Sequence, residues 1–190
     1  MIIAVSGTQN VGKTTFIKDF IGAFPNFTTP LIDYRKLISA HNLKINREGD
    51  YRSQQILLDF IISDTGEHTG DVILDRSCVD AYVYGLWHYL HRPVASGFTA
   101  EGIRYQYEQM CKAVNRYDKI FFIPLRSNPN IKIEDDKFRD MNIEYRAEID
   151  RLFSVTLDGF GQGFRESVVV EISGSRGQRV EQAREMFNKN

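Results

Sequence analysis

Hydrophobic positions near the start of the chain form two patterns in succession. Residues 2–6 make a short apolar run ended by Gly7, which is typical of a strand buried on both faces of a parallel sheet. From Lys13 onwards the apolar positions recur at helical spacing, and Pro25 ends this stripe. The pattern therefore predicts a strand, a glycine turn and a helix, in that order.

The same alternation continues to the end of the sequence. The pattern predicts further strands at 27–32, 72–74, 119–125 and 167–172, and further helices at 53–64, 79–90, 99–116, 149–157 and 180–187. Strands that alternate with helices lie parallel and are covered on both sides, with right-handed crossovers between them. The sequence therefore predicts an α/β fold, a three-layer sandwich with a central parallel five-stranded sheet and helices on both faces.

Length and charge narrow the class of protein. The 190 residues suit one domain, 1–190, and show no repeat or low-complexity tract. The chain has 25 Asp and Glu residues and 24 Lys and Arg residues, which gives a net charge of −1. This net charge produces no overall attraction to nucleic acid or to an anionic membrane. Any contact with a polyanion must therefore be local.

Neither the cysteines nor the hydropathy point to a secreted or membrane protein. Cys78 and Cys111 lack the spacing of a metal site or a disulfide framework, and we expect them to be buried free thiols. The first residues do not resemble a signal peptide, and no stretch approaches the roughly 18 apolar residues that cross a bilayer. We therefore expect a protein of the reducing cytosol with no membrane partner.

The glycine turn carries the most specific motif. Residues 7–14 read GTQNVGKT, which fits the phosphate-loop pattern G-x-x-x-x-G-K-[ST] between a strand and a helix. Backbone amides of such a loop bind phosphate oxygens, its lysine binds the β- and γ-phosphates of ATP, and its Ser or Thr hydroxyl holds Mg²⁺. The predicted nucleotide-binding residues are Gly7, Asn10, Val11, Gly12, Lys13, Thr14 and Thr15. Among these, Lys13 is also a predicted catalytic residue and Thr14 a predicted metal ligand.

Three charged residues follow the strand predicted at 72–74. Asp75 stands at the carboxyl end of that strand, where ligands of parallel sheets gather, and we predict that it holds Mg²⁺ through a bound water. The alternative is a cap for the helix that follows. Arg76 and Asp80 come next and are predicted to bind the phosphate acceptor, with exposed surface charge as the alternative.

Together with a charged stretch at 135–139, these motifs resemble those of small P-loop kinases that act on nucleosides and nucleotides. The chain is most similar to the ribosylnicotinamide-kinase domain family, sometimes grouped under an AAA-type ATPase label, and the resemblance spans nearly the whole chain. It implies the P-loop NTPase form of the sandwich, with ATP and Mg²⁺ as cofactors and a mobile lid at about 126–139. The family's lid motif, Asp-Gly-x-Arg, reads Asp136-Lys137-Phe138-Arg139 here, without the glycine.

The lid and a segment after the second strand supply further candidate residues. Phosphoryl transfer places negative charge on the γ-phosphate oxygens, so we predict that Arg139 binds ATP and stabilises that charge, in preference to Arg146. An ordinary charged helix face is the alternative for both arginines. The family's acidic-aromatic-basic signature resembles 33–36, and it places Asp33 and Arg35 at the acceptor. We predict that Asp33 orients the acceptor hydroxyl and accepts its proton, with a cap of the next helix as the alternative.

A loop with two glycines, 174–177, follows the last predicted strand. In similar kinases this loop passes over the adenine, so the resemblance makes Arg176 a candidate for stacking on the base. A plain turn between a strand and a helix is the alternative.

These features predict an ATP- and Mg²⁺-dependent kinase that transfers the γ-phosphoryl group to a hydroxyl or phosphate of a nucleoside, nucleotide or related compound. One alternative is a phage-type kinase acting on a polynucleotide, at a 5′ end or a hydroxymethylated base. A loose basic series keeps it open: Arg35, Lys36, Lys44, Arg47 and Arg52. Another alternative is a nucleotide switch or ATPase, although the Asn-Lys-x-Asp guanine motif of GTPases is absent. The sequence does not specify the oligomeric state.

Overall fold

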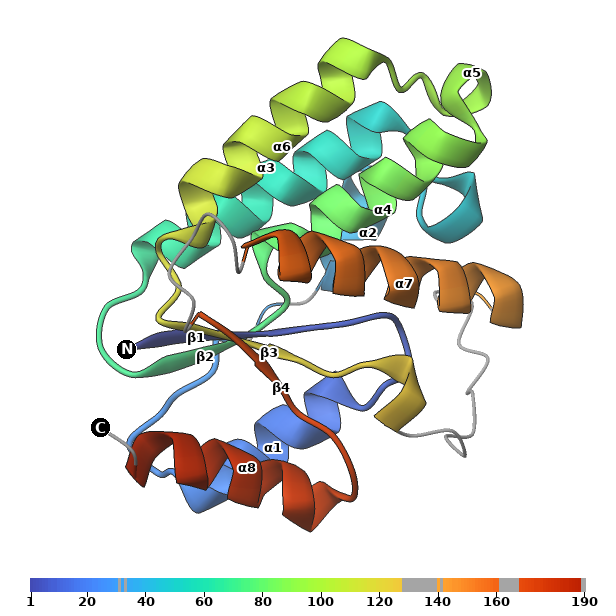
Figure 1. Ribbon diagram of the computed structural model, residues 1–190. Coiled ribbons are helices and arrows are strands. Elements are labelled where there is room, and N and C mark those ends of the chain that lie inside the picture. The colour runs from blue at the N-terminus through green and yellow to red at the C-terminus, as the bar shows by residue number, and fades with distance from the viewer. Residues whose placement is uncertain (31, 33, 128–139, 141, 161–167, 189–190) are drawn as a thin grey trace.

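A parallel sheet forms the middle layer of the computed structural model, which describes residues 1–30, 32, 34–127, 140, 142–160 and 168–188. The strands follow the order β2-β1-β3-β4 across the sheet (Figure 1). They are β1 (Ile2–Ser6), β2 (Val72–Asp75), β3 (Lys119–Phe122) and β4 (Val169–Glu171). Because β1 pairs on both edges and is covered on both faces, its sequence is apolar rather than alternating.

Helices cover both faces of the sheet. On one face lie α1 (Lys13–Ala23) and α8 (Arg176–Asn188), which pack against each other. On the other face lie α3 (Tyr51–Glu67), α4 (Cys78–His91), α6 (Ala100–Val114) and α7 (Ile143–Phe160) (Figure 1). Shorter segments are α2 (Tyr34–Ala40), α5 (Pro93–Ser96) and the 3₁₀ turns η1 (Asn46–Glu48) and η2 (Leu125–Ser127). The three-layer α/β architecture predicted from the pattern is confirmed.

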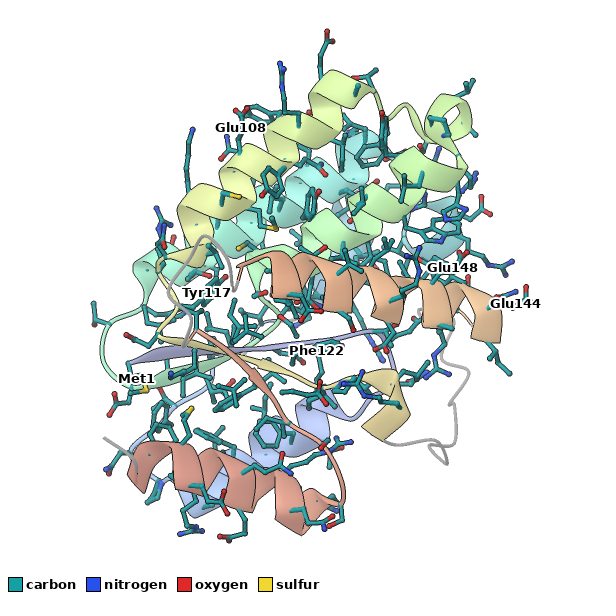
Figure 2. The ribbon with its side chains drawn as sticks, viewed as in Figure 1. Met1, Glu108, Tyr117, Phe122, Glu144 and Glu148 are labelled. Atoms are coloured by element: carbon teal, nitrogen blue, oxygen red, sulfur yellow. The ribbon has the colours of Figure 1, made fainter. Side chains whose placement is uncertain are left out.

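Successive side chains along the strands point to opposite faces of the sheet, so the core has two parts. In β1, Ile3 and Val5 pack into the cluster on the side of α1 and α8, whereas Ala4 packs into the cluster on the other face. On that other face, Phe122 of β3 lies between the sheet and α7, where its ring stacks on Phe153 with centroids 6.0 Å apart (Figure 2). The two clusters hold the ends of the strands, and so the site described below, in fixed positions.

The predicted fifth strand, at 27–32, is not a strand in the described part of the chain. Thr28 makes a single parallel bridge to Val72, in which Thr28 N donates to Asp71 O at 3.0 Å and Ile73 N donates to Thr28 O at 2.9 Å. Pro30 follows two residues later and has no amide hydrogen to continue the ladder. The segment therefore begins to pair at the free edge of β2, and the described sheet has four strands rather than five.

Other elements differ from prediction in their extent. The strand predicted at 119–125 ends at Phe122, and the chain turns into η2 directly after Pro124. The helix predicted at 149–157 is longer and runs from Ile143 to Phe160. The predicted lid, about 126–139, falls almost entirely on residues outside the described ones, so it stays a prediction.

The cysteines and the hydropathy agree with most of what the sequence predicts. Cys78 and Cys111 are both free, and Cys78 is fully buried, whereas Cys111 is only partly covered. Burial raises the pKa of the Cys78 thiol to about 12, which keeps it protonated and unreactive. Among the described residues, no helix combines the length and apolar character that crossing a membrane requires.

A buried histidine fixes the η1 turn against α4. His88 is fully buried, and its ring lies parallel to that of Phe98 with centroids 6.2 Å apart. A Cβ at Gly49 would come within 2.4 Å of His88 Nε2, so only glycine permits this close approach. Burial lowers the pKa of His88 to about 4.

His88 should make the stability of the protein depend on pH. The unfolded side chain, with a pKa of 6.5, takes up a proton that the folded side chain excludes until about pH 4. The free energy of unfolding should therefore fall as the pH drops through 6.5, by about 2 kcal/mol at pH 5 from this residue alone. Urea unfolding of the wild type and His88→Gln, compared at neutral pH and at pH 5, measures this component. An equal pH dependence in the two proteins would contradict the assignment.

Candidate active site

The motif at 7–14 forms a loop between the carboxyl end of β1 and the first turn of α1, as predicted. Gly7, Asn10 and Gly12 adopt positive φ angles of 142°, 61° and 90°, which turn the chain sharply at three places. A Cβ at Gly7 would come within 2.5 Å of Ile123 O, so a side chain there is excluded sterically as well. The loop is thus held close to the end of β3.

Lys13 curls back over the loop that precedes it. Its side chain is buried, and Nζ donates hydrogen bonds to Gly7 O at 2.7 Å and to Thr8 O at 2.9 Å. Lys13 is also the first residue of α1, so its ammonium group lies beside the positive end of the helix dipole. This concentration of positive charge is suited to a phosphate group.

Thr14 and Asp75 meet at the carboxyl end of the sheet. The hydroxyl of Thr14 donates to Asp75 Oδ2 at 3.0 Å, across the gap between α1 and β2. Hydroxyl and carboxylate oxygens are the ligands that Mg²⁺ prefers, and this ion usually keeps several waters and phosphate oxygens besides one or two protein ligands. No group of three or more His, Cys, Asp or Glu side chains suited to a metal occurs in the described residues. The pair therefore fits Mg²⁺ that is bound together with a nucleotide.

Asp75 does not cap the helix that follows it, the alternative left open by the sequence. The cap of α4 is Ser77, whose hydroxyl accepts from Val79 N at 3.1 Å, and Ser77 N donates in return to Asp80 Oδ2 at 3.1 Å. This reciprocal pair is a capping box. The Asp75 carboxylate is thereby left for Thr14.

The backbone at Arg76 is strained and firmly anchored. Arg76 has a φ of 91°, in a region that residues other than glycine rarely adopt. Its amide donates to Val5 O at 3.1 Å, and two residues later Cys78 N donates to the hydroxyl of Tyr117 at 3.1 Å. Tyr117 is buried in the core and lies between the end of α6 and the start of β3 (Figure 2). These bonds hold the strained turn between β2 and α4.

The side chain of Arg76 lies between an aromatic ring and carboxylates. Its guanidinium carbon is 5.3 Å from the centre of the Tyr34 ring, a cation–π geometry. Burial opposes its charge, but Asp80 and then Asp75 outweigh this effect and raise the pKa of Arg76. Asp80 itself is only 1% exposed, with Oδ1 3.9 Å from the Arg76 Nη1 atom. Asp80 therefore faces Arg76 rather than open solvent.

Two cations from other elements reach the phosphate loop. Arg146 on α7 is buried and donates from Nη2 to Gln9 O at 3.3 Å, and burial lowers its pKa. Arg179 on α8 is buried too, and it donates from Nη1 to Val11 O at 2.9 Å and from Nε to Gly174 O at 3.0 Å. Arg179 thus joins the phosphate loop to the loop after β4.

A third long-range link ties the phosphate loop to residue 140. The side-chain amide of Gln9 donates to Asp140 O at 2.9 Å and accepts from Asp140 N at 3.1 Å. The Asp140 carboxylate in turn accepts from Arg47 Nε at 2.5 Å. Sequence reasoning missed Gln9, Arg179 and Asp140 as site residues. Gln9 occupies a variable position of the motif, and the other two look like ordinary charges in polar segments.

The remaining predicted site residues differ in their partners and in their exposure. Arg176 donates from Nε and Nη2 to Asp19 at 2.8 and 2.6 Å, so its guanidinium is held against α1, and stacking on a base stays a prediction. Val11 is buried, whereas Thr15 and Arg35 are exposed. Asp33 and Arg139 lie outside the described residues.

Solved structures share this fold. The NadR protein in complex with NR matches with a TM-score of 0.71 and 20% identity, over 98% of this chain and 51% of the NadR chain. Deoxyadenosine kinase from M. mycoides, with products dCMP and a flexible dCDP bound, matches with a TM-score of 0.71 and 13% identity, over 100% of this chain and 99% of its own. The same kinase with bound dATP gives a TM-score of 0.67 at 12% identity.

The comparisons therefore establish the fold and no closer relationship. This chain spans about half the length of NadR and nearly the whole length of the deoxyadenosine kinase. No family model and no curated protein matches the sequence. The α/β fold expected from the motifs is confirmed, and these neighbours share it.

Arg179 should stabilise the phosphate loop, whereas Arg176 on the same helix should not. Arg179→Met leaves the carbonyl oxygens of Val11 and Gly174 without their donor and should lower the free energy of unfolding by about 1–3 kcal/mol. Arg176→Met removes an exposed ion pair and serves as the matched control, with little expected change. Chemical unfolding of both variants measures the difference. Equal losses in the two variants would show that Arg179 is not the clamp described here.

Proposed function

We propose that the protein is an ATP- and Mg²⁺-dependent kinase that transfers the γ-phosphoryl group to a hydroxyl or phosphate of a nucleoside, nucleotide or related compound. The observation that carries this proposal is the phosphate loop itself, in which Lys13 curls over the loop while Thr14 bonds Asp75 at the adjacent strand end. Neighbours of the same fold support it, since they include a deoxyadenosine kinase with nucleotides bound and NadR with NAD and AMP-PNP.

The donor side of the reaction is assigned to the loop. Lys13 exchanges the carbonyls of Gly7 and Thr8 for oxygens of the β- and γ-phosphates, and it stabilises the charge that develops during transfer. Thr14, and Asp75 through water, would hold Mg²⁺, which would supply positive charge to neutralise the same phosphates. Arg146 keeps the loop backbone in place through Gln9.

The acceptor side is assigned to the turn after β2 and the start of α2. Arg76, held against Tyr34, directs its guanidinium toward the acceptor, and Arg35 and Asp33 contribute from the neighbouring segment. Asp33 is proposed to orient the hydroxyl and accept its proton. Kinetics of Asp33→Asn with ATP and acceptor varied separately test this role, since a loss confined to ATP affinity would place Asp33 on the donor side.

A polynucleotide acceptor is the second candidate, and the structure weakens the feature that suggested it. Of the loose basic series, Arg47 is paired with Asp140 and Lys44 with Asp50, at 2.5 and 3.4 Å. Paired cations contribute less to the binding of a phosphate backbone. We therefore favour a small acceptor and retain oligonucleotides in the test below.

A screen of acceptors tests the proposed function. Purified protein with ATP and Mg²⁺ is assayed for ADP release against nucleosides, nucleotides and 5′-hydroxyl oligonucleotides. We expect release that depends on a nucleoside-like acceptor, and loss of at least about 100-fold in Lys13→Ala because transition-state stabilisation by the loop is removed. Dependence on oligonucleotides alone would favour the second candidate. Hydrolysis without any acceptor, or full activity in Lys13→Ala, would contradict a kinase of this kind.

Asp75→Asn should alter the requirement for metal. The amide keeps the size of the side chain but is a poorer ligand for Mg²⁺, so activity should need a higher Mg²⁺ concentration and reach a lower maximum. Titration of Mg²⁺ at saturating ATP measures the shift against the wild type. An unchanged titration curve would mean that Asp75 serves only to bond Thr14.

A further inference from the structure

A buried carboxylate lies behind the cations of the candidate active site. Asp80, on the first turn of α4, is 1% exposed, and its Oδ1 atom accepts no hydrogen bond in the described part of the chain. Arg76 faces that oxygen, with its Nη1 atom 3.9 Å away. We propose that Asp80 is a positioning residue for phosphoryl transfer, which fixes the guanidinium of Arg76 and balances the positive charge of Lys13. The proposal rests on the function proposed above.

The helix cap alone does not account for this carboxylate. The capping box uses one oxygen, Oδ2, which accepts from Ser77 N at 3.1 Å, and the neutral amide of an asparagine would supply the same acceptor. A buried ionised group costs free energy unless a cation compensates it. Lys13 and then Arg76 oppose the effect of burial, which raises the pKa of Asp80. The carboxylate therefore depends on these two cations to limit the cost of its charge.

Asp80 also belongs to a buried network that joins the two halves of the site. The hydroxyl of Ser77 lies 2.7 Å from that of Ser6, the last residue of β1, and Ser6 immediately precedes the phosphate loop. The same Ser77 follows Arg76 and is bonded to Asp80. A displacement of Asp80 would therefore shift both the start of the phosphate loop and the turn that carries Arg76.

The guanidinium of Arg76 is fixed from two sides. Its backbone is held at a φ of 91°, the ring of Tyr34 lies 5.3 Å from its guanidinium carbon, and Asp80 faces it from the protein interior. Lys13 and Arg76 repel each other, and a carboxylate near both reduces that repulsion. Without this charge, the positive potential at the phosphate loop rises while the position of Arg76 is less well defined.

Asp80→Asn separates these two effects because it keeps the cap and removes the charge. Affinity for ATP, measured by calorimetry without any acceptor, should increase about threefold or more. The turnover number with the acceptor identified by the screen should fall on the order of tenfold or more, because the guanidinium is displaced. A residue with a merely structural role would not tighten nucleotide binding while slowing transfer.

Asp118→Asn is the matched control. Asp118 also accepts a backbone hydrogen bond, from Ile2 N at 2.7 Å, but it stands before β3, at the end of the sheet opposite the phosphate loop. It carries the same change of net charge, and we expect ATP affinity and turnover to stay at wild-type values. An equal increase of ATP affinity in Asp118→Asn would attribute the effect to net charge and overturn the proposal.

A double-variant comparison tests whether Asp80 acts through Arg76. In an Arg76→Gln background, Asp80→Asn should cause less than about a twofold further loss of turnover, because the group that it positions is absent. Independent, multiplicative losses would contradict positioning. So would Asp80→Asn with wild-type kinetics, which is the result expected if Asp80 serves only as a helix cap that asparagine retains. Weaker ATP binding with a lower midpoint of thermal unfolding would also contradict the proposal.

Failure of the proposed kinase function can be told apart from failure of the role proposed for Asp80. If the wild type binds ATP and phosphorylates no acceptor, the kinase assignment is wrong. The calorimetric comparison then still decides the electrostatic part of the proposal, since unchanged ATP affinity in Asp80→Asn overturns it.

Discussion

The carbonyl oxygens of the phosphate loop impose the constraint on which the rest of the site depends. A loop whose amides converge on a phosphate must turn its carbonyls outward, and buried carbonyls need donors. Three buried cations provide them: Lys13 at Gly7 and Thr8, Arg146 at Gln9, and Arg179 at Val11. These donors are charged, so each bond is stronger than one between neutral groups. The same cations therefore shape the loop and set its positive potential.

This arrangement also connects the two helical layers. Arg179 comes from α8 on one face of the sheet and Arg146 from α7 on the other, and both end at the loop that follows β1. The loop is thereby clamped between layers whose cores do not merge. In the proposed reaction, binding of phosphate would change what Lys13 bonds, while the two arginines, which touch the outer carbonyls, keep the backbone in place.

Local sequence patterns predict the strand, loop and helix of the motif but not the long-range hydrogen bonds that surround the loop. The run at 2–6, the glycines and Lys13 lie close together in sequence, so strand, loop and helix follow from periodicity and one motif. The bonds from Gln9 to Asp140 and from Arg179 to Val11 join residues separated by 131 and 168 positions, and no short pattern encodes them. Within the described residues, the predicted fifth strand is limited for a local reason, since Pro30 interrupts the ladder just after Thr28.

Asp75 and Asp80 show why residue type and spacing cannot assign roles within one short segment. Asp75 ends β2 and Asp80 comes shortly after it, and both are aspartates near a helix start, so either fits a ligand or a cap by sequence. The structure separates them by exposure and partner. Asp75 is only half-buried at the strand end and bonds the hydroxyl of Thr14, whereas Asp80 is enclosed and faces Arg76. Because water and a metal can reach the first carboxylate and not the second, Asp75 is suited to ligand chemistry and Asp80 to holding other groups in place.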